Sequence, residues 1–349
     1  VYSRSSKSIT PSPEARAALG LAAEQESYSP TELIRAMLCA PVDLLWNGGI
    51  GTYVKASTQS HADVGDKAND PIRVDGHELR CKVVGEGGNL GCTQLGRIEA
   101  ARAGIRINTD AIDNSAGVDT SDHEVNIKIL LQPLLESGGL DRDARSTLLA
   151  SMTDDVAEHV LADNYAQNLV LGVARSEAGR MVSVDRRLIA DLERRNILDR
   201  GLEYLPTDRE LAVRQAAGEG LVSPEYCVLL AYAKMSLYDE LLASDLPDDA
   251  PLAEDLEEYF PKPLRKNHAD AIKRHRLRRE IIATAVTNAM INRAGIVFVN
   301  DMRERTNATS PEITRAYTVA QQVFGLRKLW DEIEALDNKV PAAAQSRML

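Results

Sequence analysis

Hydrophobic and polar positions follow two different patterns along the chain. Before about residue 125, short apolar runs end in glycine-rich or polar turns, as in "PVDLLW" before "NGGIG". A helical segment lies between the second and third runs. Strand, glycine-rich turn and helix in this order are typical of a parallel α/β sheet. The predicted strands are 41–46, 79–87 and 105–110, and the predicted helices are 12–24, 29–40 and 92–104.

From residue 127 onward, apolar residues recur at helical spacing and strands nearly vanish. In "VAEHVLADNYAQNLVLGVAR" the apolar side chains fall three or four positions apart, which predicts a helix. The segment "GIVFVN" (295–300) is an exception that reads as a loop or a lone strand. The other helices are expected at 141–151, 183–195, 207–217, 223–243, 252–260, 268–294 and 310–335.

The stretch "DNSAGVDTSDHEVN" (113–126) joins the two patterns. It is too rich in small and polar residues for a strand, and it leads into the apolar run "IKILLQPLL". Ser121 is followed three residues later by Glu124, which is the capping-box signature of a helix start. We therefore expect a helix to begin at Ser121.

Composition narrows the class of protein. The chain has 349 residues and a formal net charge of -11, which disfavours binding to a nucleic-acid backbone. Its four cysteines form no C-x-x-C pair, so we expect reduced thiols and a cytoplasmic location. The first residues lack the apolar run of a signal peptide, and no apolar run reaches the ~18 residues of a membrane span. We therefore expect neither nucleic acid nor membrane as a partner.

The ends of the three predicted strands carry asparagine and glycine. Asn47, Asn89 and Asn114 each stand in such a turn. Ligands of open parallel sheets bind at the carboxyl ends of the strands. An asparagine side chain offers both a donor and an acceptor, which matches a carboxamide such as that of nicotinamide. The turns "GEGGNLG" and "NGGIGTYVK" do not match G-x-G-x-x-G, so on their own they also fit plain tight turns.

Two of these segments resemble a known family. "VVGEGGNLGCTQLG" and "INTDAIDNSAGVDTSDHE" are similar to the second half of the NAD-binding domain of glutamate dehydrogenases, with Gly88, Gly91, Cys92 and Thr109 among the departures. "APVDLLWNGGIGTYVKAS" and "LRREIIATAVTNAMINRAGIVFV" resemble the large NAD-specific bacterial subfamily. The resemblance runs nearly from end to end.

The resemblance implies roles for six residues. Asn89 and Asn114 would lie near the nicotinamide and its ribose, and Asn47 and Gly48 beside the cofactor at a strand end. Ser121 would bind a carboxylate of glutamate. Val118 would pack against that substrate. The implied cofactor is NAD, and the implied reaction converts L-glutamate to 2-oxoglutarate and ammonia.

The resemblance also implies a division of the chain. Residues 1–126 would form the C-terminal half of a Rossmann-like NAD-binding domain, an α/β fold, and 127–349 a mainly helical C-terminal domain. The family's catalytic lysines and aspartate have no counterpart here, so we assign no catalytic residue. We expect the chain to be a fragment without turnover of its own, from a parent enzyme that forms a homo-oligomer. The alternatives are a non-catalytic assembly module and a dehydrogenase for a different amino acid.

Other candidate residues have simpler interpretations. His123 is predicted to be a local turn or packing residue, with a proton shuttle as the alternative. Lys55 is expected to be solvated, with a phosphate contact as the alternative. The basic segment 262–280 is expected to be a solvated helix face. The remaining histidines show no metal-ligand spacing, so no metal site is predicted.

Overall fold

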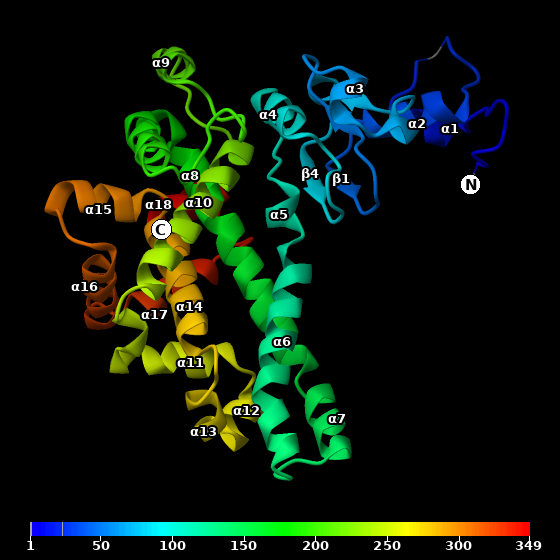
Figure 1. The fold of residues 1–349 in the computed structure, drawn as a ribbon. Helices are drawn as coiled ribbons and strands as arrows, with labels where there is room; N and C mark the ends of the chain where they lie inside the picture. Colours follow the sequence, from blue (N-terminus) through cyan, green and yellow to red (C-terminus); the bar gives the residue numbers. More distant parts are fainter. Residues whose placement is uncertain (1, 23) are drawn as a thin grey trace. The chain divides into compact units, whose positions relative to one another are not determined.

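The computed structural model describes residues 2–22 and 24–349, which form two compact units. The first unit comprises the described part of Val1–Ser115 together with Gly201–Leu205 and Leu221–Cys227. The second comprises Ala116–Arg200, Pro206–Gly220 and Val228–Leu349. Figure 1 traces the order of their elements.

The first unit is built around two short parallel strand pairs. Strand β1 (Leu44–Asn47) pairs with β4 (Val83–Glu86) in parallel, and β2 (Val54–Lys55) pairs with β3 (Val74–Asp75) in parallel. The prediction of a third strand at 105–110 is wrong. Only a parallel bridge between Val83 and Arg106 forms there, because helix α5 (Asp110–Asp113) begins almost at once.

The helices predicted in this unit are confirmed, with shorter limits. Ser12 and Ser29 cap the first two through bonds to backbone N–H groups, and a left-handed Gly20 ends the first. Thr93 caps the third. These helices are α1 (Pro13–Leu19), α2 (Pro30–Leu38) and α4 (Gln94–Arg102). The polar segment between β2 and β4 adds α3 (His61–Val64), η1 (Lys67–Asn69) and η2 (Gly76–Glu78).

The core of the first unit lies between the strands and α4. Buried aliphatic side chains from both strand pairs, including Val54, Val74 and Val84, pack there with Ala100 of α4. A Cβ atom at Gly76 would lie 2.5 Å from the carbonyl oxygen of Gly96, so glycine permits this close approach of η2 and α4. All four cysteines are free thiols, as the sequence predicts.

The second unit is helical. Helix α6 starts at Ser115, and α8 runs for 42 residues, joining two segments that the sequence pattern separates. Its first elements are α6 (Ser115–Glu136), α7 (Arg142–Ala150), α8 (Thr153–Arg194), α9 (Asp208–Ala216) and α10 (Ser223–Leu242). They are followed by η3 (Leu246–Asp248), η4 (Ala250–Leu252), α11 (Ala253–Tyr259), α12 (Lys262–Asn267), α13 (Ala269–Lys273), α14 (Arg278–Ala294), α15 (Phe298–Thr306), α16 (Ser310–Val323), α17 (Leu326–Glu334) and α18 (Ala342–Met348).

Two long predicted helices are divided in the structure. The segment 268–294 breaks between α13 and α14, and 310–335 breaks at Gly325, which has a φ of 60°. The segment 295–300 is not a strand. Gly295, with a φ of 101°, ends α14, and the chain then enters α15. Glycines with positive φ therefore set two of these boundaries.

The second unit has α14 near its centre. Its buried side chains include Ile282, Val286 and Met290.

Among the described residues no single helix is long and apolar enough to cross a membrane. Helices α14 and α15 pass that test of length and composition only as a pair, and they are bent by 86° where they meet. The fold is therefore mainly helical, with a small parallel sheet component in the first unit.

Candidate functional site

The four residues predicted to bind a cofactor lie in the first unit. Asn47 is the last residue of β1, and Gly48 follows it. The backbone N–H of Gly88 donates to the carbonyl oxygen of Asn47 at 3.0 Å. The turns after β1 and β4 are therefore bonded to each other.

Asn114 extends this group. Its amide nitrogen donates to Oδ1 of Asn89 at 2.7 Å and to the carbonyl oxygen of Gly88 at 3.3 Å. The structure thus brings together the asparagines that the sequence places at three separate turns. Within the described chain, Nδ2 of Asn47 is buried without a hydrogen-bond partner. An unsatisfied buried donor is costly, so this atom is suited to a ligand oxygen.

Glycines allow the two turns to pack this closely. A Cβ atom at Gly88 would lie 2.5 Å from the carbonyl oxygen of Gly49, and one at Gly87 would lie 2.5 Å from the ring of Trp46. Nothing lies within 4 Å of a Cβ built at Gly49. Gly88 is one of the departures from the resembled pattern, and here it permits the turn-to-turn contact.

A buried ion pair between Arg97 and Glu86 stabilises the turn after β4. Arg97 of α4 donates from Nε and Nη2 to the two carboxylate oxygens of Glu86, at 2.7 and 3.0 Å. Glu86 also accepts the N–H of Cys92 at 3.0 Å. Burial raises the pKa of Glu86, and the bonds to Arg97 oppose that rise. This bidentate pair fixes the end of β4 against the start of α4.

Two aspartates of α5 complete the frame. Asp110 lies 3.2 Å from Arg97 and accepts the N–H of Leu90 at 2.7 Å. Asp113 accepts the N–H of Glu86 at 3.0 Å, and burial raises its pKa. Carboxylates therefore hold the backbone of the Asn89 turn in place.

The two residues predicted to bind substrate lie in the second unit, on α6. Val118 is 68% exposed, and Ser121 is exposed. The prediction that Ser121 caps this helix is wrong, because α6 already begins at Ser115. Ser121 lies in its second turn and donates to the carbonyl oxygen of Gly117 at 3.3 Å. Its hydroxyl remains accessible as a donor or acceptor.

Lys55 differs from the solvated lysine that the sequence suggests. Its side chain is buried, forms an ion pair with Asp75, and donates to the carbonyl oxygen of Ala56 at 3.2 Å. The register of β2 against β3 places this pair side by side. Lys55 therefore stabilises the strand pair.

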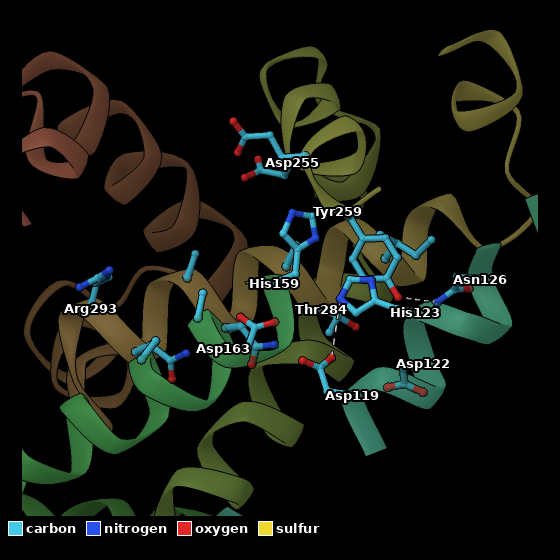
Figure 2. Close-up of a pocket in the computed structure, with 18 of the residues that line it drawn as sticks. Asp119, Asp122, His123, Asn126, His159, Asp163, Asp255, Tyr259, Thr284 and Arg293 are labelled. Carbon is cyan, nitrogen blue, oxygen red and sulfur yellow. Dashed lines mark hydrogen bonds and ion pairs between the residues drawn. The ribbon is translucent and has the colours of Figure 1, made fainter. Parts of the chain in front are cut away.

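The second unit contains a cavity of about 550 Å³ that the sequence did not indicate. Figure 2 shows its labelled side chains, which come from α6, α8, α11 and α14. His123 is 2% exposed and stacks on Tyr259, with ring centroids 4.5 Å apart. Asn126 donates to the hydroxyl of Tyr259 at 2.8 Å. Burial lowers the pKa of His123, which favours a neutral imidazole at pH 7.

The lining of this cavity is rich in carboxylates. Some are paired: Arg327 lies 3.3 Å from both Asp255 and Glu258. Asp119 of α6 and Asp163 of α8 have no such arginine among the described residues. The signal for this cluster is the spacing of Asp119 and His123, and of His159 and Asp163, because residues four apart share one face of a helix.

Comparisons with known proteins identify the family of the chain. Residues 1–174 match the family model "Bacterial NAD-glutamate dehydrogenase, catalytic domain", and residues 218–349 match "Glutamate dehydrogenase, C-terminal". The chain belongs to the bacterial NAD-glutamate dehydrogenase family. It is 49% identical over 349 residues to the NAD-specific glutamate dehydrogenase of Halomonas elongata and 50% identical over 349 residues to that of Pseudomonas aeruginosa. It is 47% identical over 352 residues to that of Mycobacterium tuberculosis.

The chain spans about a fifth of the length of these glutamate dehydrogenases. All of it is covered in each comparison, against 22%, 21% and 22% of the three relatives. The segment matching the catalytic-domain model includes the whole turn group around Asn47 and also Val118 and Ser121. The lining of the cavity draws on both matched segments, with Asp163 in one and Tyr259 in the other.

Proposed function

We propose that the chain is part of an NAD-dependent glutamate dehydrogenase that converts L-glutamate to 2-oxoglutarate and ammonia. The turn group of the first unit would hold the nicotinamide and ribose end of NAD. Helix α6 would contact glutamate through Ser121 and Val118. Bound NAD would accept a hydride from the α-carbon of glutamate. No residue of this chain is assigned to acid–base chemistry.

The convergence of Asn47, Asn89 and Asn114 carries this proposal. The unpartnered Nδ2 of Asn47 would donate to the oxygen of a carboxamide. It lies against Gly91, where a Cβ atom would overlap it, so glycine keeps this side of the donor uncovered. The hydrogen bond from Asn114 to Oδ1 of Asn89 fixes the orientation of the Asn89 amide. In this proposal Nδ2 of Asn89 then donates to the ligand. The ligand would thus bind at the carboxyl ends of β1 and β4.

We also propose that this region is half of a Rossmann-like domain. The parallel pairing of β1 with β4, and the parallel bridge from Val83 to Arg106, support three neighbouring segments in one sheet. In this proposal residues 1–126 bind the cofactor and 127–349 form the helical domain. The exposed apolar side chains of Leu44 and Trp46 on β1 support a covering partner, such as the rest of the enzyme or another subunit. A homo-oligomeric, cytoplasmic enzyme that binds neither nucleic acid nor membrane is part of the same proposal.

Titration of NAD tests the cofactor site. We expect Asn114→Ala to weaken NAD binding to the chain about three- to tenfold, the effect of one hydrogen bond. Asn267→Ala, an exposed asparagine of α12, serves as the control and should leave binding unchanged. Equal affinities of wild type and Asn114→Ala in calorimetry would remove Asn114 from the cofactor site.

Substitution of Ser121 tests the substrate site in the full-length enzyme. Ser121→Ala should raise KM for glutamate about 10-fold or more while NAD binding stays unchanged, because a bond to a charged carboxylate is lost. Norvaline, which lacks the second carboxylate, should be used equally well by both forms. Ser146→Ala is the matched control, since Ser146 makes the same type of helix bond, to the carbonyl oxygen of Arg142 at 3.0 Å. An equal loss with norvaline would favour a purely structural Ser121 or a different amino-acid substrate.

A further inference from the structure

Three potential metal ligands meet at one edge of the cavity in the second unit. Asp119 and His123 stand on α6, and Asp163 stands on α8. One ligand atom from each of the three lies within 4.8 Å of the other two. Nε2 of His123 is 3.9 Å from Oδ1 of Asp119, which is too long for a hydrogen bond (Figure 2).

The helical spacing explains why these side chains converge. Asp119 and His123 are four residues apart on α6, so they project from the same face. His159 and Asp163 repeat this spacing on α8, and the rings of His123 and His159 have centroids 5.6 Å apart. Two facing helices therefore each present one carboxylate and one imidazole. Metal sites in helical bundles are commonly built in this way.

The buried imidazole of His123 points to a missing partner. His123 is 2% exposed, and its Nδ1 has no hydrogen-bond partner within the described residues. Its Nε2 lies 3.9 Å from Oδ1 of Asp119, a contact that is an ion pair only when the imidazole is protonated. Oδ2 of Asp119 is also buried and unpartnered there. Buried polar atoms normally have partners, so these two neighbouring unpartnered atoms, Nδ1 of His123 and Oδ2 of Asp119, indicate a missing ligand.

The local charge favours a cation. The carboxylates of Asp119 and Asp163 have ligand atoms within 4.8 Å of each other at this edge of the cavity. Burial lowers the pKa of Lys234 of α10 to about 8, although Asp163 and Asp119 act in the opposite direction. Among the described residues, the ammonium of Lys234 interacts electrostatically with both carboxylates. A divalent ion would neutralise the two carboxylates more completely than one ammonium.

We propose that Asp119, His123 and Asp163 bind a divalent transition-metal ion, with Zn²⁺ the best match. A mixed set of imidazole and carboxylate ligands suits Zn²⁺ better than Mg²⁺ or Ca²⁺, which prefer oxygen alone. Ligands about 2.1 Å from a tetrahedral zinc lie roughly 3.4 Å apart, so small side-chain rotations would close the site. Three protein ligands leave one position open toward the cavity, for water or a small anion.

Metal-binding measurements on the purified 349-residue chain test this site. After removal of metal with a chelator, we expect one equivalent of Zn²⁺ to bind and to raise the melting temperature. Co²⁺ should bind in its place and give the visible absorption of a four-coordinate site. Asp163→Asn, which keeps the shape of the side chain, should weaken Zn²⁺ binding at least about 100-fold. Asp122→Asn is the matched control, since Asp122 lines the same cavity from α6 but lies outside the cluster.

A second pair of variants separates the metal from the competing ammonium. Lys234→Met should strengthen Zn²⁺ binding, because it removes a cation that repels the metal ion. His123→Asn should abolish the Co²⁺ absorption while circular dichroism shows an intact fold. The proposal is overturned if wild type binds no stoichiometric metal, or if Asp163→Asn and His123→Asn bind it as tightly as wild type. These outcomes do not depend on NAD or glutamate binding.

Discussion

Two buried polar clusters, one in each unit, differ in how far the chain itself satisfies their polar atoms. In the first unit, both carboxylate oxygens of Glu86 accept hydrogen bonds from Arg97, and one also accepts from a backbone N–H. In the second, Asp119 and His123 have buried polar atoms without partners among the described residues. The first cluster lies where strand, turn and helix meet, and the second lies between helices α6 and α8. Only one of them is satisfied by the chain itself.

This difference separates a supporting frame from an incomplete site. The frame around Glu86 fixes backbone turns, and within the described part of this unit it leaves one buried donor without a partner, Nδ2 of Asn47. Its geometry is set before any ligand arrives. In our proposal a metal ion completes the cluster around His123, so the geometry of the cluster depends on what binds there. Three substitutions test this contrast.

Removal of Arg97 should have the largest effect. Arg97→Met leaves the fully buried Glu86 carboxylate without its partner, which should lower the free energy of unfolding by about 3–5 kcal/mol. Urea unfolding followed by circular dichroism measures the loss. Lys82→Met serves as the control, because the Lys82–Asp43 pair is 80% and 86% exposed and its loss should be undetectable. Equal stabilities of the two variants would show that Glu86 is not held as a buried anion.

A methyl group in the turn after β4 should have an intermediate effect. Gly88→Ala forces the turn away from the carbonyl oxygen of Gly49 and should cost about 1–3 kcal/mol through overpacking. It should also weaken NAD binding, since the two turns separate. Gly49→Ala is the control, because nothing lies within 4 Å of its Cβ position. Calorimetric titration measures NAD binding to both variants. Equal affinities of Gly88→Ala and Gly49→Ala would contradict this interpretation.

The pH dependence of stability gives the third test, because its effect is confined to a narrow pH range. The pKa of Asp163 is raised from 3.8 to about 6 in the folded state, so its stabilising effect is present below pH 3.8 and is lost as the pH rises toward 6. In metal-free buffer, Asp163→Asn should remove this decline in the free energy of unfolding. Unfolding curves between pH 4 and 6 measure it, with Asp122→Asn as the control. An unchanged slope in Asp163→Asn would show that this carboxyl is not buried beside Asp119.

Much of the first unit was predictable because its signals are local. Ser12, Ser29 and Thr93 cap the expected helices, and Asn47 ends an expected strand. The sequence could not show that the third segment forms only a single β-bridge, because the apolar pattern of 105–107 fits either a strand or a bridge. The burial of Lys55 also escaped prediction. Its partner Asp75 is twenty residues away and is brought beside it only by strand pairing.

The second unit shows where local signals end. Helix positions and the end of a helix before Gly295 could be predicted from the sequence, but the unbroken α8 and the division at Gly325 could not, because glycine is compatible with either outcome. The cluster of Asp119, His123 and Asp163 joins helices forty residues apart in sequence. Each helix shows a four-residue spacing of aspartate and histidine, but only packing reveals that the two faces meet.

The distribution of tryptophan makes the two candidate sites optically separable. The chain has two tryptophans. Trp46 stands directly before Asn47 and is 60% exposed, while Trp330 lines the cavity with the guanidinium of Arg293 5.3 Å from its ring. A Trp46→Phe chain would therefore emit from the cavity alone, and a Trp330→Phe chain from the asparagine turns alone. One tryptophan therefore stands next to the asparagine turns and the other in the lining of the cavity, so cofactor and metal titrations can be followed independently without an added label.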